Sequence, residues 1–151
     1  MSDPVMSSEP AISPATNSGA GNAGAGRVGD HHRVDLTRLQ GLVVTADLTP
    51  DAGQRYLAAH RALRETAALV LRVRTRSQTP AQPDSRLWAL VSRHAPELAE
   101  WAGYLSAIQP RHDAAQRGEL PISDREADDL VRDAQTFLGL AGTLRVGGVR
   151  R

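Results

Sequence analysis

The sequence TPDAGQRYLAAHRALRETAALVLRVRTR, residues 49–76, decides the fold that we predict for this chain. One set of its residues recurs at intervals of four and three, which places the set on one face of a helix. Thr49 can cap that helix, Pro50 suits its first turn, and Asp51 favours the positive end of the helix dipole. We therefore expect one long helix here, with a core-facing stripe of Tyr56, His60, Leu63, Ala67, Val70 and Arg74.

Two further regions around this segment show the same periodicity. Residues 35–47 form an apolar face, and their short connection to the basic segment predicts two antiparallel helices. A third helix starts with a cap at Asp84 or Ser85, bends before Pro96, and continues an apolar face up to Pro110. This region therefore predicts either two short helices or one kinked helix.

The last helix has the clearest start signal in the chain. Residues 111–121 are polar and are predicted to connect two helices. The pair Ser123 and Glu126 that follows fits a capping box. The chain contains no alternating pattern long enough to predict a β-strand. The sequence therefore predicts an all-α fold, an up-and-down bundle of four to five helices.

The 151 residues are expected to form one domain between two tails. Residues 1–33 are rich in Ser, Pro, Gly and Ala, with the low-complexity run GAGNAGAG, and they predict a disordered tail. Residues 34–145 form the helical domain, and residues 146–151 form a flexible C-terminal tail.

Composition excludes several classes of protein. The chain has no cysteine, so it has no disulfide framework and no thiolate chemistry. The formal net charge of +1 argues against general nucleic-acid binding by the whole surface. No run approaches the roughly 20 apolar residues of a membrane span, and no apolar signal core precedes the domain. We expect a cytoplasmic protein that does not contact a membrane.

The sequence predicts no metal site and no cofactor. The adjacent residues His31 and His32 point in different directions and do not form a site together. The acids near the start of the last helix fit a solvated first turn that favours the helix dipole, because hard cations need converging oxygens. These acids are Asp128, Asp129 and Asp133.

Arg55 and His60 are the candidate catalytic residues. An arginine can stabilise charge developing on a phosphate, and a histidine can move a proton near neutral pH. Five steps along a helix turn the chain by about 140°, so these two side chains do not stack on one another. In the alternative interpretation, His60 is an inert core histidine and Arg55 is solvated.

A set of arginines on the same segment is a candidate binding site for nucleic acid or phosphate. Such a basic flank attracts phosphates with an affinity that falls steeply with salt. The alternative is that these arginines pair with the acids of the last helix within the bundle. The candidate binding residues are Arg61, Arg64, Arg72, Arg74 and Arg76.

Several stretches together resemble the HEPN superfamily of helical domains, and most closely the small actinobacterial subfamily of SAV type. They are R-Y-x-x-A-H running into ALR-x-TAALVL, then W-A-L-V, H-A-P-E-L-A-E-W-A and READDLVRDAQTFL. The resemblance covers about residues 35–144. It implies a helical bundle that dimerises, and many members bind RNA or nucleotides.

Catalytic members of the superfamily are metal-independent endoribonucleases. The resemblance implies that such members use an arginine and a histidine separated by four to six residues in the later half of the domain. Dimerisation brings these two residues together. In the corresponding stretch here, PRHDAAQRGELP, no histidine follows Arg111 or Arg117 at that spacing. Arg55 and His60 have the spacing but lie in an earlier helix.

We therefore predict a non-catalytic HEPN-like domain that binds RNA, a nucleotide or a partner protein, such as a cognate antitoxin, through its basic helix. One alternative is a homodimeric, toxin-like endoribonuclease that uses Arg55 and His60. The other is a module for protein–protein interaction alone.

Overall fold

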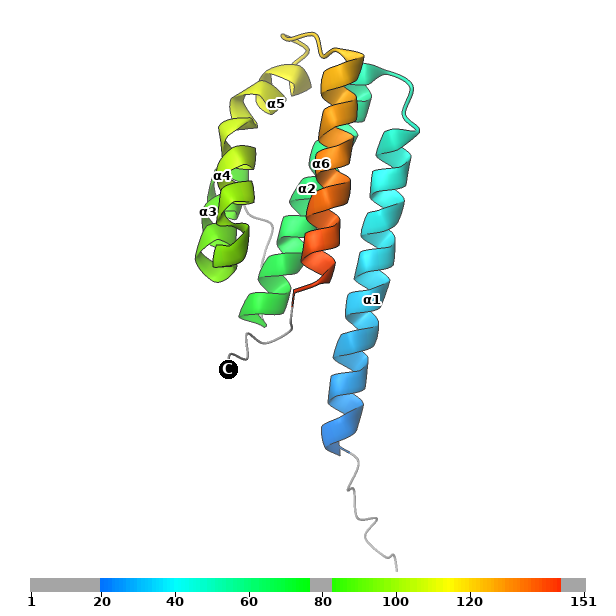
Figure 1. Ribbon diagram of the computed structural model, residues 1–151, viewed down its shortest axis with the longest axis vertical. Helices are drawn as coiled ribbons and strands as arrows, with labels where there is room; N and C mark the ends of the chain where they lie inside the picture. The colour runs from blue at the N-terminus through cyan, green and yellow to red at the C-terminus, as the bar shows by residue number, and fades with distance from the viewer. Residues whose placement is uncertain (1–19, 77–82, 145–151) are drawn as a thin grey trace, which may run out of the picture.

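The computed structural model describes residues 20–76 and 83–144, which form an all-α bundle with no strand among them (Figure 1). The predicted fold class is confirmed. Among the described residues there are six α-helices and one 3-10 turn. They are α1 (Ala20–Asp47), α2 (Ala52–Thr75), α3 (Asp84–His94), η1 (Pro96–Leu98), α4 (Ala99–Ala107), α5 (Gln109–Gln116) and α6 (Asp124–Gly142).

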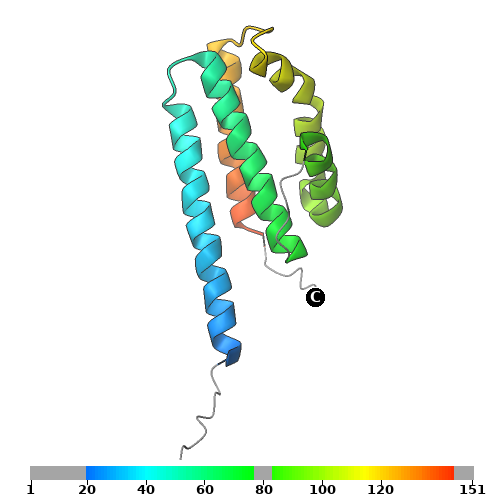
Figure 2. The same cartoon turned by 180° about the vertical axis from the view of Figure 1, so that it is seen from behind.

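The long helix α2 occupies the centre of the bundle. It lies between α1 and a side arm made of α3, η1, α4 and α5, and α6 packs behind it (Figure 2). Ion pairs from Asp35 to Arg72 and from Arg38 to Glu65 confirm that α1 and α2 are antiparallel. The side arm leads the chain back to the end where α2 begins, so α6 runs in the same direction as α2 (Figure 1).

The core contains alanine, leucine and valine around a few aromatic rings. Phe137 of α6 lies between the two tryptophans of the side arm, with ring centroids 6.3 Å from Trp88 and 5.6 Å from Trp101. Alanines let the central helices α2 and α6 approach closely, because they add little side-chain bulk. The fully buried alanines of these two helices are Ala59, Ala62, Ala67, Ala127, Ala134 and Ala141.

Two predicted helix caps are wrong. Asp51, not Thr49, caps α2, and its carboxylate accepts a hydrogen bond from the Gln54 N–H at 2.9 Å. The Thr49 hydroxyl instead donates to the Thr45 carbonyl at the end of α1, at 2.7 Å. Pro83 occupies the cap position of α3, and Asp84 is already helical.

The helix α1 begins at Ala20, earlier than the predicted start at residue 35, while the boundary between tail and domain at residue 33 stays a prediction. Extending a formed helix costs less than nucleating a new one, which favours this longer helix despite its glycines. Residues 1–19 and 145–151, the rest of the predicted tails, lie outside the described residues.

The predicted polar connection at residues 111–121 is largely helical. The apolar face ends near Pro110 as expected, but the helical structure continues, because Pro110 lies in the first turn of α5, where a missing N–H costs nothing. Gly118 follows α5 with a φ of 72°, a left-handed conformation that glycine adopts without strain. The connection to α6 is therefore short.

The predicted start of α6 is confirmed. The Ser123 hydroxyl accepts a hydrogen bond from the N–H of Glu126 at 3.1 Å. The pKa of the Glu126 carboxyl lies below its usual range, chiefly because Arg111 binds it, and the Ser123 backbone acts in the same direction. Among the described residues, no helix combines the length and apolarity that crossing a bilayer requires.

We expect Ser123→Ala to lower the free energy of unfolding by about 1 kcal/mol, because an orphan N–H loses its acceptor. Urea denaturation followed by circular dichroism measures this loss. Ser85→Ala is the matched control, because Ser85 is exposed in the first turn of α3, whose start has no side-chain cap. Equal losses in the two variants would contradict the assignment of Ser123 as the cap.

Candidate functional site

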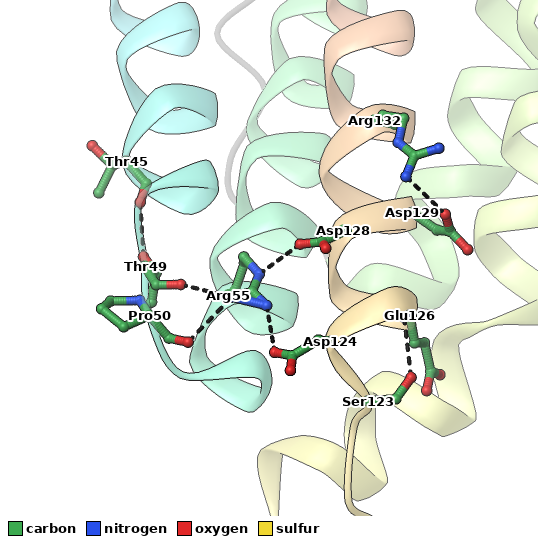
Figure 3. Close-up of polar contacts among 10 residues, drawn as sticks. All are labelled: Thr45, Thr49, Pro50, Arg55, Ser123, Asp124, Glu126, Asp128, Asp129 and Arg132. Carbon is green, nitrogen blue, oxygen red and sulfur yellow. Dashed lines mark hydrogen bonds and ion pairs between the residues drawn. The ribbon is translucent and has the colours of Figure 1, made fainter.

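Arg55 connects the α1–α2 turn to the first turn of α6 (Figure 3). Its Nη1 donates to the carbonyls of Thr49 and Pro50, at 3.1 and 3.2 Å. Its Nη2 donates to Asp124 Oδ1 at 2.8 Å, and its Nε lies 3.0 Å from Asp128 Oδ1. Arg55 is only 8% exposed, so its guanidinium is directed entirely at groups of its own chain.

His60 belongs to a different cluster, between α2, α3 and α5. Its ring is 1% exposed and stacks on the ring of His112, with centroids 3.5 Å apart and planes 17° apart. Burial lowers the pKa of His60 to about 4, and His112 acts in the same direction, whereas Asp84 and the Gln109 amide oppose the shift. His60 is therefore neutral at pH 7.

The two predicted catalytic residues are not brought together within one chain. Among the described residues, Arg55 and His60 share no hydrogen-bond or ion-pair partner. The core position of His60 agrees with the inert interpretation of the sequence, but Arg55 is buried and not solvated as that interpretation held. A catalytic role for the pair stays a prediction.

The arginines of the basic flank that face α1 are exposed and loosely paired. The side chain of Arg61 is 67% exposed and lies 3.8 Å from Glu65 of its own helix. Arg72 is 41% exposed and lies 3.6 Å from Asp35. Arg38 of α1 joins the same surface through Glu65, at 3.0 Å.

The other arginines of the flank differ from one another. Arg64 is half-exposed and pairs with Asp84 of α3 at 3.3 Å. Arg74 is largely buried by the side arm and binds Glu97, so it faces away from the flank. Arg76 ends α2, and no ion pair joins its side chain to the described residues. The acids that pair with the flank belong to α1, α2 and the side arm, and not to α6 as the alternative interpretation expected.

A groove of about 280 Å³ opens between the side arm and the first turns of α6. Tyr104 and Arg111 line it, but Tyr104 donates to Asp133 at 2.7 Å and Arg111 is held by both oxygens of Glu126. Arg125 also lines the groove and is exposed, so the groove presents one further arginine beside these paired groups.

Three residues that no local motif connects form a cluster of possible ligands. His60, Asp84 and His112 each place one ligand atom within 4.8 Å of the others. Gln109 lies against them, with Nε2 2.8 Å from Asp84 Oδ2 and 3.3 Å from His112 Nδ1. The sequence contains no spacing signal for this cluster, because its members come from three different helices.

The family model described as SAV_6107-like HEPN matches residues 46–141. The matched span runs from the end of α1 almost to the end of α6, and it includes Arg55, His60, His112 and the flank. Comparisons with curated proteins and with solved structures find no match to this chain.

Proposed function

This chain belongs to the SAV_6107-like HEPN family, and we propose that it is a non-catalytic member that binds RNA or a nucleotide through exposed arginines of α2. The proposed contact surface consists of Arg61, Arg64 and Arg72 of α2 and Arg76 at its C-cap, with Arg38 of α1 beside them. The ligand is recognised by its phosphates.

The observation that carries the proposal is the difference between two kinds of arginine. Arg61 and Arg72 form long ion pairs at exposed positions, and such pairs contribute about 0–1 kcal/mol each. A phosphate can therefore replace their carboxylate partners at little cost. Arg55 is buried against two carbonyls and two carboxylates, so a ligand cannot displace its partners as readily.

The same geometry favours binding over cleavage. A general acid or base must come within about 2.6–3.2 Å of the proton it transfers. His60 is 1% exposed beneath α3 and α5, and the guanidinium of Arg55 points to α6. Neither side chain presents its functional atoms on the surface that carries the exposed arginines.

We expect the double variant Arg61→Ala/Arg72→Ala to bind a short labelled single-stranded RNA at least tenfold more weakly than the native chain. The test is fluorescence anisotropy with the full chain between about 50 and 200 mM salt. Because each lost phosphate contact removes about 0.7 from the slope of log K against log salt, the slope should fall by roughly 1.4.

Arg132→Ala is the matched control, because Arg132 is 72% exposed and lies 3.5 Å from Asp129 on α6. It should leave the affinity unchanged. Equal weakening in both variants, or no binding at the lowest salt, would contradict the proposed surface and leave a protein-interaction module. RNA cleavage that His60→Ala abolishes without loss of helix content would instead establish the endoribonuclease alternative.

A further inference from the structure

The cluster of His60, Asp84 and His112 contains buried polar atoms that the rest of the described chain does not satisfy. The Nε2 of His60 and the Oε1 of Gln109 are both buried without a partner in hydrogen-bond geometry. Leaving a buried polar atom unsatisfied costs about 1–3 kcal/mol, so two such atoms in one cluster are unusual. Gln109 Oε1 carries lone pairs, as does His60 Nε2 in the tautomer with its proton on Nδ1, and an electron-pair acceptor would then satisfy both atoms.

We propose that His60, Asp84 and His112 bind one divalent transition-metal ion of the zinc type, with Gln109 Oε1 beside them as a further oxygen donor. Two imidazoles and a carboxylate suit zinc and its neighbours, whereas magnesium and calcium prefer oxygen ligands alone. This site adjoins the proposed RNA surface, because Arg64 of that surface lies 3.3 Å from Asp84. It also departs from the sequence analysis, which predicted no metal.

The surroundings of His112 match those of a metal ligand. A histidine that binds a metal through one ring nitrogen usually donates the other N–H to a carboxylate, which fixes the ring. Asp113 Oδ1 lies 3.2 Å from His112 Nδ1, and Gln109 Nε2 donates to the same carboxylate oxygen at 2.9 Å. Donation of Nδ1–H to Asp113 leaves the other nitrogen of His112 unprotonated, which is the form that binds a metal.

Asp84 is similarly supported by its neighbours. One carboxylate oxygen lies 3.3 Å from Arg64, and the other accepts from Gln109 at 2.8 Å. Its side chain is 15% exposed, so this ligand is the most exposed of the three. The stacked imidazoles would move apart on binding, since two ligands of a tetrahedral ion do not point along parallel directions.

The ion would join three helices that the chain connects only through loops. His60 lies on α2, Asp84 begins α3, and His112 lies on α5. A metal ion bound by all three residues would link the side arm to the central helix α2. Because the ligands need not be arranged this way in the unfolded chain, binding adds directly to the stability of the folded state.

The test uses the full chain without an affinity tag, freed of metal by a chelator and titrated with Zn²⁺ by calorimetry and with Co²⁺ by visible absorption. We expect one equivalent to bind, with the absorption of a tetrahedral or five-coordinate cobalt site. Asp84→Asn and His112→Asn should each weaken binding by about tenfold or more. Zn²⁺ should raise the thermal midpoint of the native chain but not that of these variants.

His31→Gln/His32→Gln is the control, because these two histidines lie on α1, outside the cluster. This variant should keep one equivalent of metal. The proposal would be overturned by loss of binding in the control alone, by unchanged binding in Asp84→Asn and His112→Asn, or by the absence of stoichiometric metal uptake. If His112→Asn does not fold, the half-buried Asp84→Asn decides the matter, since its amide keeps the shape of the carboxylate.

Discussion

Phe137→Ala is expected to lower the free energy of unfolding by about 3–5 kcal/mol, the range for removing a fully buried aromatic ring. Phe137 is 0% exposed and packs against Trp88 and Trp101. The cavity would open where α6 meets the side arm, and the alanine-rich helices around it have few flexible side chains that could fill the space. Urea denaturation measures the loss from the shift in midpoint at constant slope.

Leu140→Ala is the matched control for this core prediction. Leu140 lies three residues further along α6 but is 38% exposed, so its truncation leaves no enclosed cavity. We expect a loss of less than about 1 kcal/mol there. A loss of similar size in both variants would mean that the ring of Phe137 is not the centre of the core.

Arg55→Ala is expected to have the next largest effect, a loss of about 2–4 kcal/mol in the free energy of unfolding. The carbonyls of Thr49 and Pro50 would lose their donor, and α6 would lose its tie to the α1–α2 turn. The loss stays below that for a fully buried ion pair, because Asp124 and Asp128 are exposed and would return to water.

Arg61→Ala is the control for charge alone, since it removes an exposed arginine of the same helix and should cost less than about 0.5 kcal/mol. Arg55→Lys should fall between the two, because an ammonium cannot reproduce the planar fork that holds four acceptors. If Arg55→Ala leaves stability unchanged, the structural role assigned to Arg55 is wrong, and the catalytic interpretation gains support.

The sequence predicts the fold class well because helical periodicity is a local signal. The stripe from Tyr56 to Val70 is buried as the intervals of three and four require, and Ser123 caps α6 as its motif predicts. The error at Thr49 arises from competition, since its hydroxyl finds a carbonyl of α1 while Asp51 caps α2. Local sequence rules do not predict which of these two residues caps α2.

The sequence predicts the candidate sites less well, because their chemistry depends on contacts between distant residues. The sequence shows how far apart Arg55 and His60 lie along one helix. It does not show that Arg55 has partners on α6, or that His60 has partners on α3 and α5. The polar stretch that contains His112 gave no sign of being a buried helix, because α5 buries little of its surface apart from that histidine.

The early start of α1 has a further consequence. Its start extends beyond the ends of α2 and α6 (Figure 1), and residues 29–31 are exposed, whereas Leu39, Val43 and Ala46 are buried. A helix segment that buries little surface opens locally at a lower free-energy cost than a segment packed in the core, which opens only when the bundle unfolds. One continuous helix therefore contains segments of different local stability, and residues 29–31 belong to the less stable segment.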